Sequence, residues 1–133
     1  MKLIYATAVG FIVMFMLDYL WFGLIFKNYW AEHMHVTGMD RVSFHAIGDL
    51  CLALLMAVVY PMGFKGGSAM SEGAKFGVLM GLIAALPSSI HAHAGNVWSL
   101  HIVAIIVLNG IIVGGLTGIA IAMVYGGNKT ATA

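Results

Sequence analysis

Residues 3–26, LIYATAVGFIVMFMLDYLWFGLIF, decide the fold of this chain. The run contains a single charged side chain, Asp18, and it exceeds the roughly 20 apolar residues that a helix needs to cross a bilayer. The composition of the whole chain agrees, because 62% of its 133 residues are hydrophobic and 8% are charged. A soluble domain carries about a quarter charged residues. The stretch therefore predicts a transmembrane helix in an integral membrane protein.

Three more apolar segments follow, at about residues 44–62, 72–90 and 100–125. Pro61 and the glycines after it end the first of these, and the polar turn HAHAGNVWS at 91–99 separates the other two. We expect residues 27–43 to form a loop that can hold a short interfacial helix anchored by Tyr29 and Trp30. The sequence predicts an all-α fold, a single domain over residues 1–133 that forms an integral membrane bundle of four transmembrane helices.

The positive charges predict how the bundle is oriented, because lysine and arginine favour the cytoplasmic side of a membrane. Four helices place both termini on one side. That side receives Lys2, Lys65, Lys75 and Lys129, and the opposite side receives Lys27 and Arg41. We therefore expect both termini in the cytoplasm. All six histidines then fall at or near the extracytoplasmic face, and Asp18 and Asp49 lie toward the same half.

Glycines recur at every fourth position of the third and fourth predicted helices. They are Gly73, Gly77 and Gly81, and Gly110, Gly114 and Gly118. This spacing forms a groove that lets helix backbones approach closely, which is how helices associate in lipid. The pattern predicts helix packing and leaves open whether the partner helix belongs to the same chain or to another copy.

The histidines form two pairs at a spacing of two residues, His33 with His35 and His91 with His93. Such a pair converges on one ion only if the backbone is extended, because in a helix the two side chains point about 200° apart. His45 and Asp49 lie four residues apart and share one face of a helix.

Imidazoles with carboxylates suit zinc, copper or iron. The candidate metal ligands are Asp18, His33, His35, His45, Asp49, His91 and His93. The alternative is that the histidines lie at the membrane interface and hydrogen-bond loop backbone and lipid headgroups.

Asp18 and Asp49 admit two interpretations. An acid inside a membrane helix is costly and usually marks a proton relay or a cation path. Alternatively, each carboxylate is hydrated near the interface, caps a neighbouring helix or pairs with Lys27 or Arg41. Asn109 lies deep in the fourth helix, where its amide needs a partner across a helix interface.

Two expectations concern packing. The single cysteine, Cys51, cannot form an intrachain disulfide, and its apolar setting LCLALL predicts a buried side chain. Pro87 should kink the third helix, with Ser88, Ser89 and Asn96 available to the carbonyls that the kink frees.

The pattern at the end of the first helix, carried by Asp18, Trp21, Gly23, Lys27, Tyr29 and Trp30, resembles small bacterial membrane proteins classed as domains of unknown function. The later glycine-rich helices, separated by a short polar turn with Trp98, are also similar to that group. The resemblance implies a four-helix fold in the bacterial inner membrane. It implies no activity, and the histidine pairs are not part of it.

These observations favour a structural or accessory membrane protein that forms homo-oligomers or joins a larger membrane complex through its glycine faces. The alternative is a protein that handles copper, zinc, protons or other cations at an extracytoplasmic site of histidines and aspartates. A small-solute transporter ranks last, since the helix pairs show no clear repeat. No nucleophile with a base and no phosphate-binding loop is present, so an enzyme is not expected. The net charge of +1 argues against nucleic-acid binding.

Overall fold

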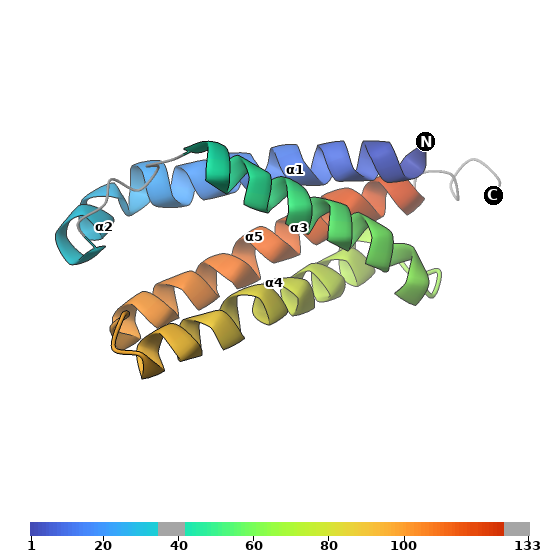
Figure 1. Ribbon diagram of the computed structural model, residues 1–133. Helices are drawn as coiled ribbons and strands as arrows, with labels where there is room; N and C mark the ends of the chain where they lie inside the picture. The colour runs from blue at the N-terminus through green and yellow to red at the C-terminus, as the bar shows by residue number, and fades with distance from the viewer. Residues whose placement is uncertain (35–41, 127–133) are drawn as a thin grey trace.

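The computed structural model describes residues 1–34 and 42–126, and over these ranges it contains helices and no strand. Its elements in chain order are α1 (Lys2–Leu20), the π-helix η1 (Trp21–Ile25), α2 (Lys27–Met34), α3 (Val42–Gly63), α4 (Ala69–Ala94) and α5 (Leu100–Gly126) (Figure 1). The segments long and apolar enough to cross a membrane are Lys2–Ile25, Val42–Gly63, Ala69–Ala94 and Leu100–Gly126. The predicted all-α bundle of four such helices is confirmed.

The ends of α4 differ most from the prediction, which placed this helix at residues 72–90. Ser68 caps its N-terminus by accepting a hydrogen bond from the Ser71 backbone N–H at 3.2 Å. At the other end the helix continues through residues 91–94 and stops at Gly95, before Asn96 adopts a left-handed φ of 55°. The histidines and alanines there do not break a helix, whereas this glycine and asparagine do.

The first spanning segment contains a feature that the sequence did not predict. Its last turn, η1, is a π-helix, in which the Phe26 N–H donates to the Trp21 carbonyl at 3.0 Å. A π-turn adds one residue to the usual helical turn and often accompanies a functional site. This one begins three residues after Asp18.

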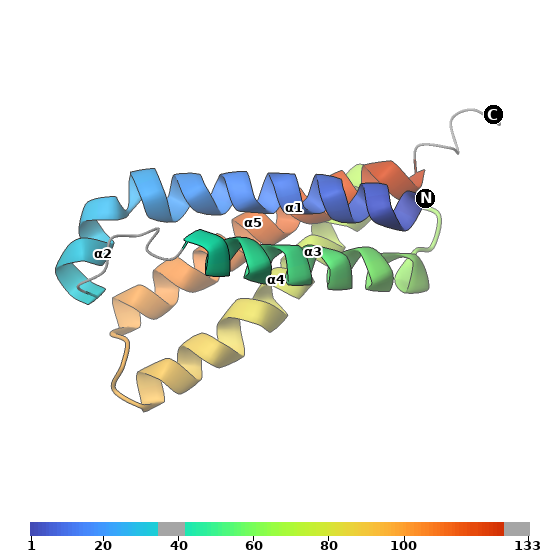
Figure 2. The same cartoon turned by 45° about the horizontal axis from the view of Figure 1, so that its top comes forward.

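The four long helices pack as a bundle with one weakly closed side. α1 lies against both α3 and α5, and α4 lies along α5, whereas α3 and α4 scarcely touch (Figures 1 and 2). The N-terminus, the end of α5 and the α3–α4 connection lie at one end of the bundle, which we call the terminal end. α2 and the α4–α5 connection lie at the opposite, distal end (Figure 2).

The six predicted packing glycines lie at the α4–α5 interface, and they pair as Gly73 with Gly118, Gly77 with Gly114 and Gly81 with Gly110. A methyl group on Gly81 would lie 2.6 Å from the carbonyl carbon of Gly110, and one on Gly118 would lie 2.6 Å from the Gly77 Cα. No side chain fits at these distances. The two glycine faces therefore pack against each other within one chain.

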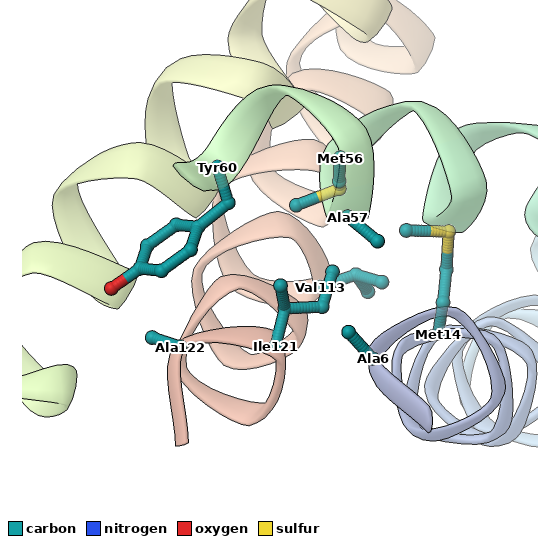
Figure 3. Close-up of a cluster of buried hydrophobic side chains, with 8 residues drawn as sticks. All are labelled: Ala6, Met14, Met56, Ala57, Tyr60, Val113, Ile121 and Ala122. Carbon is teal, nitrogen blue, oxygen red and sulfur yellow. The ribbon is translucent and has the colours of Figure 1, made fainter. Parts of the chain in front are cut away.

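An apolar core joins the other helices toward the terminal end. Its buried residues are Ala6 and Met14 of α1, Met56, Ala57 and Tyr60 of α3, and Val113, Ile121 and Ala122 of α5 (Figure 3). The Tyr125 hydroxyl donates to the Ala57 carbonyl at 2.8 Å and ties α5 to α3. α1, α3 and α5 are thus held by side-chain packing, and α4 is held by its backbone contact with α5.

The outer surfaces of all four long helices are apolar and face outward, as expected for a multi-pass protein in a lipid bilayer. Leu55, Leu79, Leu108 and Met16 each expose 49% or more of their surface. Cys51 is also exposed, so the prediction that it is buried was wrong. Leu50 and Leu54 beside it are also exposed, whereas Ala53 is buried, and composition alone does not distinguish these two environments.

Candidate functional site

Asp18 and Asn109 meet inside the bundle. The Asn109 side-chain amide donates to Asp18 Oδ1 at 2.9 Å, which links α1 to α5. Asn109 exposes only 8% of its surface, whereas Asp18 is half-buried. A polar amide in an apolar helix gains most from a partner across the helix interface. The partner that the sequence could not name for Asn109 is therefore the acid of the first helix.

Asp49 brings a second carboxyl group to the same place from α3. The side chains of Asp18 and Asp49 are within hydrogen-bonding reach of each other. Ionised carboxylates only accept hydrogen bonds, and two of them in contact repel. A direct hydrogen bond between the two groups therefore requires a proton on one of them, whereas two ionised groups need a cation or a bridging water between them.

A cavity of about 200 Å³ borders this cluster on the side where α3 and α4 scarcely touch. It is lined by Asp18, Asp49 and Asn109, and on α4 by small residues that include Gly81, Ala84, Ala85 and Ser88. Short side chains on α4 leave space that longer ones would fill. The polar cluster thus faces a cavity instead of close-packed protein.

The cavity ends on the apolar core. Met14, Met56 and Val113 line it and also belong to the buried core cluster (Figure 3). Toward the terminal end the polar groups therefore meet a packed apolar layer.

Toward the distal end the neighbour of the cluster is His45, one helical turn before Asp49 on α3. Its side chain is exposed, and its ring centroid lies 6.3 Å from that of Phe22. The imidazole also lies close enough to Asp18 to interact with it electrostatically. An exposed titratable group thus stands between the distal surface and the acid pair.

Two oxygens in the cavity wall lack hydrogen-bond partners among the described residues, Asn109 Oδ1 and Asp49 Oδ2. Buried polar atoms nearly always have a partner, which is protein, water or an ion. Each of these atoms can accept a hydrogen bond or coordinate a cation. The site can therefore bind a hydrogen-bond donor or a cation.

His33 and His93 lie apart from this cluster and bond locally. His33 Nδ1 is 3.0 Å from the Tyr29 carbonyl oxygen, and its ring stacks on that tyrosine. His93 Nδ1 is 2.9 Å from the Trp98 carbonyl oxygen. His91 and His93 both lie in α4, so they diverge, and the extended pair considered from the sequence is not formed. His35 lies outside the described residues.

The predicted set of metal ligands is therefore divided. Asp18, Asp49 and His45 lie near one another, whereas His33 and the pair on α4 lie elsewhere. Within residues 1–34 and 42–126, no group of three or more His, Cys, Asp or Glu side chains is placed to hold a metal ion. Copper or zinc binding stays a prediction that depends on further residues.

The aromatic residues after Asp18 pack on one another. Trp30, which the sequence assigns to the membrane interface, is 3% exposed and packs on Phe22 with ring centroids 5.3 Å apart. The ring centroids of Trp21 and Phe26 lie 4.9 Å apart. These rings fold α2 against the end of the first spanning segment. They close the distal side of α1 near the acid pair.

The sequence contained one signal for this site, because its polar residues lie at similar depths within their predicted membrane-spanning helices. Asp49 lies seven residues after the start of α3 and Asp18 seven residues before the end of η1, which places each about 10 Å from the distal end of its span. Asn109 lies nine residues after the start of α5. Polar residues at one depth in neighbouring helices are candidates for contact.

Fold and site together define the class of this protein as a multi-pass helical membrane protein with a carboxyl pair inside its bundle. No protein family, curated protein or solved structure matches the chain. The resemblance to small bacterial membrane proteins therefore stays a prediction, and the function has to be inferred from the site.

Proposed function

We propose that this protein handles protons, with Asp18 and Asp49 as the pair that takes up and releases a proton within the membrane. The contact between the two carboxyl groups carries the proposal. Intramembrane acids that face a cavity usually belong to proton or ion pathways. Asn109 orients the pair, because its amide holds Asp18 Oδ1 at 2.9 Å.

A proton suits the site better than a transition metal. The two carboxyl groups are already within hydrogen-bonding reach, a separation that a shared proton satisfies. The described residues supply no third acidic, histidine or cysteine ligand in position. Sodium, which prefers oxygen ligands, is the closest competitor, and the experiment below separates the two.

The residues around the acid pair favour proton exchange with water at the distal end of the bundle. His45 is exposed there, and an imidazole ring can both accept and donate a hydrogen bond, so it suits a relay between surface water and Asp49. Met14, Met56 and Val113 separate the pair from the terminal end. Transfer across the whole membrane therefore requires this apolar layer to open.

We further propose that the protein lies in a bacterial inner membrane with both termini in the cytoplasm. Lys2, Lys65 and Lys75 lie at the terminal end, and Lys27 lies at the distal end. Val97, 70% exposed in the α4–α5 connection, offers a test. A Val97→Cys variant in a Cys51→Ser background should react with a membrane-impermeant maleimide added to intact cells. Labelling only after the cells are permeabilised would mean the opposite orientation.

The accessory role predicted from the sequence lacks the surface it relied on. Each glycine face is covered by the other, so a second copy or a larger complex would have to bind elsewhere. Metal binding and self-association stay predictions. Metal analysis of untagged protein and its mass in mild detergent test them.

Proton handling is tested with purified protein in liposomes that enclose a pH-sensitive dye. With a potassium diffusion potential imposed by valinomycin, wild-type protein should carry protons faster than empty liposomes do. Asp18→Asn and Asp49→Asn should both reduce the rate to that of empty liposomes, because neither amide can exchange a proton. Adding sodium chloride at equal concentration inside and outside, with the potassium gradient kept, should leave the wild-type rate unchanged.

The matched control is Glu32→Gln, which neutralises an exposed acid of α2 away from the pair. This variant should keep the wild-type rate. Equal rates in wild type, Asp18→Asn and Asp49→Asn would contradict the proposal. A flux that appears only with a sodium gradient would assign the site to sodium.

A further inference from the structure

A second cavity, unrelated to the acid pair, lies at the terminal end. Its volume is about 400 Å³, and it lies between the end of α3 and the first turns of α4. Its lining is Tyr60, Gly63, Phe64, Lys65, Glu72, Lys75, Phe76 and Leu79. Cationic, aromatic and aliphatic side chains thus share one cavity at the edge of the spanning segments.

The two lysines give this cavity its charge. Both are exposed, and no ion pair joins either ammonium group to a described carboxylate. Glu72 is nearby, but its Oε1 accepts from the Gly67 N–H at 2.7 Å and its Oε2 from the Lys65 N–H at 3.4 Å. The acid therefore closes the loop between α3 and α4, and the ammonium groups stay available to an anion.

Tyr60 provides a second and independent sign of a ligand. The side chain is 3% exposed, and its hydroxyl finds no hydrogen-bond partner in the described part of the chain. The ring points from α3 toward α4 (Figure 3). It is held by Phe76 and Tyr125, with centroids 5.2 Å and 5.7 Å away. A buried hydroxyl in a cavity wall calls for a polar ligand atom.

The apolar part of the cavity continues along α4 into the membrane. Lys75, Leu79 and Ile83 are spaced four residues apart and therefore follow one face of the helix. Leu79 is 57% exposed and Ile83 is 58% exposed. A molecule with its anionic group at Lys75 could lay a hydrocarbon chain along this face.

We propose that this cavity binds the phosphate headgroup of an anionic phospholipid in the leaflet at the terminal end. Lys65 and Lys75 contact the phosphate, the Tyr60 hydroxyl bonds to a headgroup oxygen, and an acyl chain lies on Leu79. Lysines at the membrane surface attract anionic headgroups in this way. The site is independent of the acid pair.

The test measures the melting temperature of purified protein in neutral detergent while lipid is added. Phosphatidylglycerol should raise the melting temperature at low mole fraction, and phosphatidylcholine should not. A Lys65→Gln, Lys75→Gln double variant should need roughly thirtyfold more phosphatidylglycerol for the same rise. Tyr60→Phe should weaken the response severalfold while keeping the ring in place.

A Lys2→Gln, Lys27→Gln double variant loses the same charge away from the cavity and should respond as wild type does. Equal weakening in the two double variants would overturn the site, because the attraction would then be general. A second arm replaces the lipid with glycerol phosphate. If that soluble anion alone produced the full rise in melting temperature, the ligand would be a free phosphate ester, and the lipid assignment would be wrong.

Discussion

The two sides of α4 show opposite kinds of packing. Against α5 it approaches so closely that the methyl group of an alanine at Gly77 would lie 2.8 Å from the Gly114 carbonyl carbon. Facing α3 it scarcely makes contact, and a cavity of about 200 Å³ lies between the two helices. The polar residues Asp18, Asp49 and Asn109 line the loose side. The close contact has no room for side chains, so the chemistry is found where the bundle is open.

This difference assigns separate roles to the helices. The α4–α5 pair is held together by close backbone contact. α1 and α3 bring the two acids to its edge, and α5 supplies the amide that holds one of them. Variants that affect one side and not the other can break or sharpen this comparison.

The largest effect is expected at the glycine contact. Gly77→Ala places a methyl group against the α5 backbone and should destabilise the protein by more than about 3 kcal/mol, since a backbone cannot give way as a side chain does. Thermal unfolding followed by circular dichroism in detergent measures it. Gly48→Ala is the control, because a methyl group there meets no described atom within 4 Å. Equal stability of the two variants would contradict the close contact.

A smaller effect is expected at the acid site. A double-mutant cycle of Asp18→Leu and Asn109→Leu should give a coupling energy of about 1 kcal/mol, the usual size for an interhelical hydrogen bond in a membrane protein. Unfolding by a denaturing detergent provides the free energies. Additive effects of the two substitutions would show that the 2.9 Å contact contributes no stability.

The Tyr125 bond between α5 and α3 should contribute less. Tyr125→Phe removes the 2.8 Å hydrogen bond to the Ala57 carbonyl and should cost about 0.5–1 kcal/mol by the same unfolding assay. Tyr5→Phe is a suitable control because Tyr5 is 58% exposed. A loss as small as that of the control would mean that packing alone ties α3 to α5.

The smallest effect is expected at Thr117, which lies on α5 beside the glycine contact. Its side chain is fully buried, and its hydroxyl has no partner within the described ranges. Thr117→Val keeps the shape and removes the unsatisfied group, so the stability should stay within about 0.5 kcal/mol of wild type or rise. A marked loss would reveal a partner for this hydroxyl.

The sequence predicted the four spans and close helix packing at the glycine faces, because apolar length and four-residue spacing are local properties. It left open whether the partner helix belonged to the same chain. It placed Asp18, His45 and Asp49 in one candidate site, but it did not name Asn109 as the partner of Asp18. The helices are apolar on every side, so no amphipathic pattern shows which face points inward. Cys51 was assigned to the wrong environment for the same reason.

The sequence also did not predict the order of the helices around the bundle. α1 lies between α3 and α5, and this arrangement brings Asp18 within reach of Asp49 on one side and Asn109 on the other. Neither composition nor spacing encodes that order. The π-turn after Leu20 adds a change in helical phase that the pattern of residues also does not show.

The central claim is that Asp18 and Asp49 share a proton, and infrared spectroscopy tests it most directly. In wild-type protein we predict the carbonyl-stretch band of a protonated carboxylic acid near neutral pH, shifted when the sample is exchanged into D2O. The band should disappear in both Asp18→Asn and Asp49→Asn and persist in Glu32→Gln. Absence of the band in wild type, or its persistence in Asp18→Asn, would contradict the account.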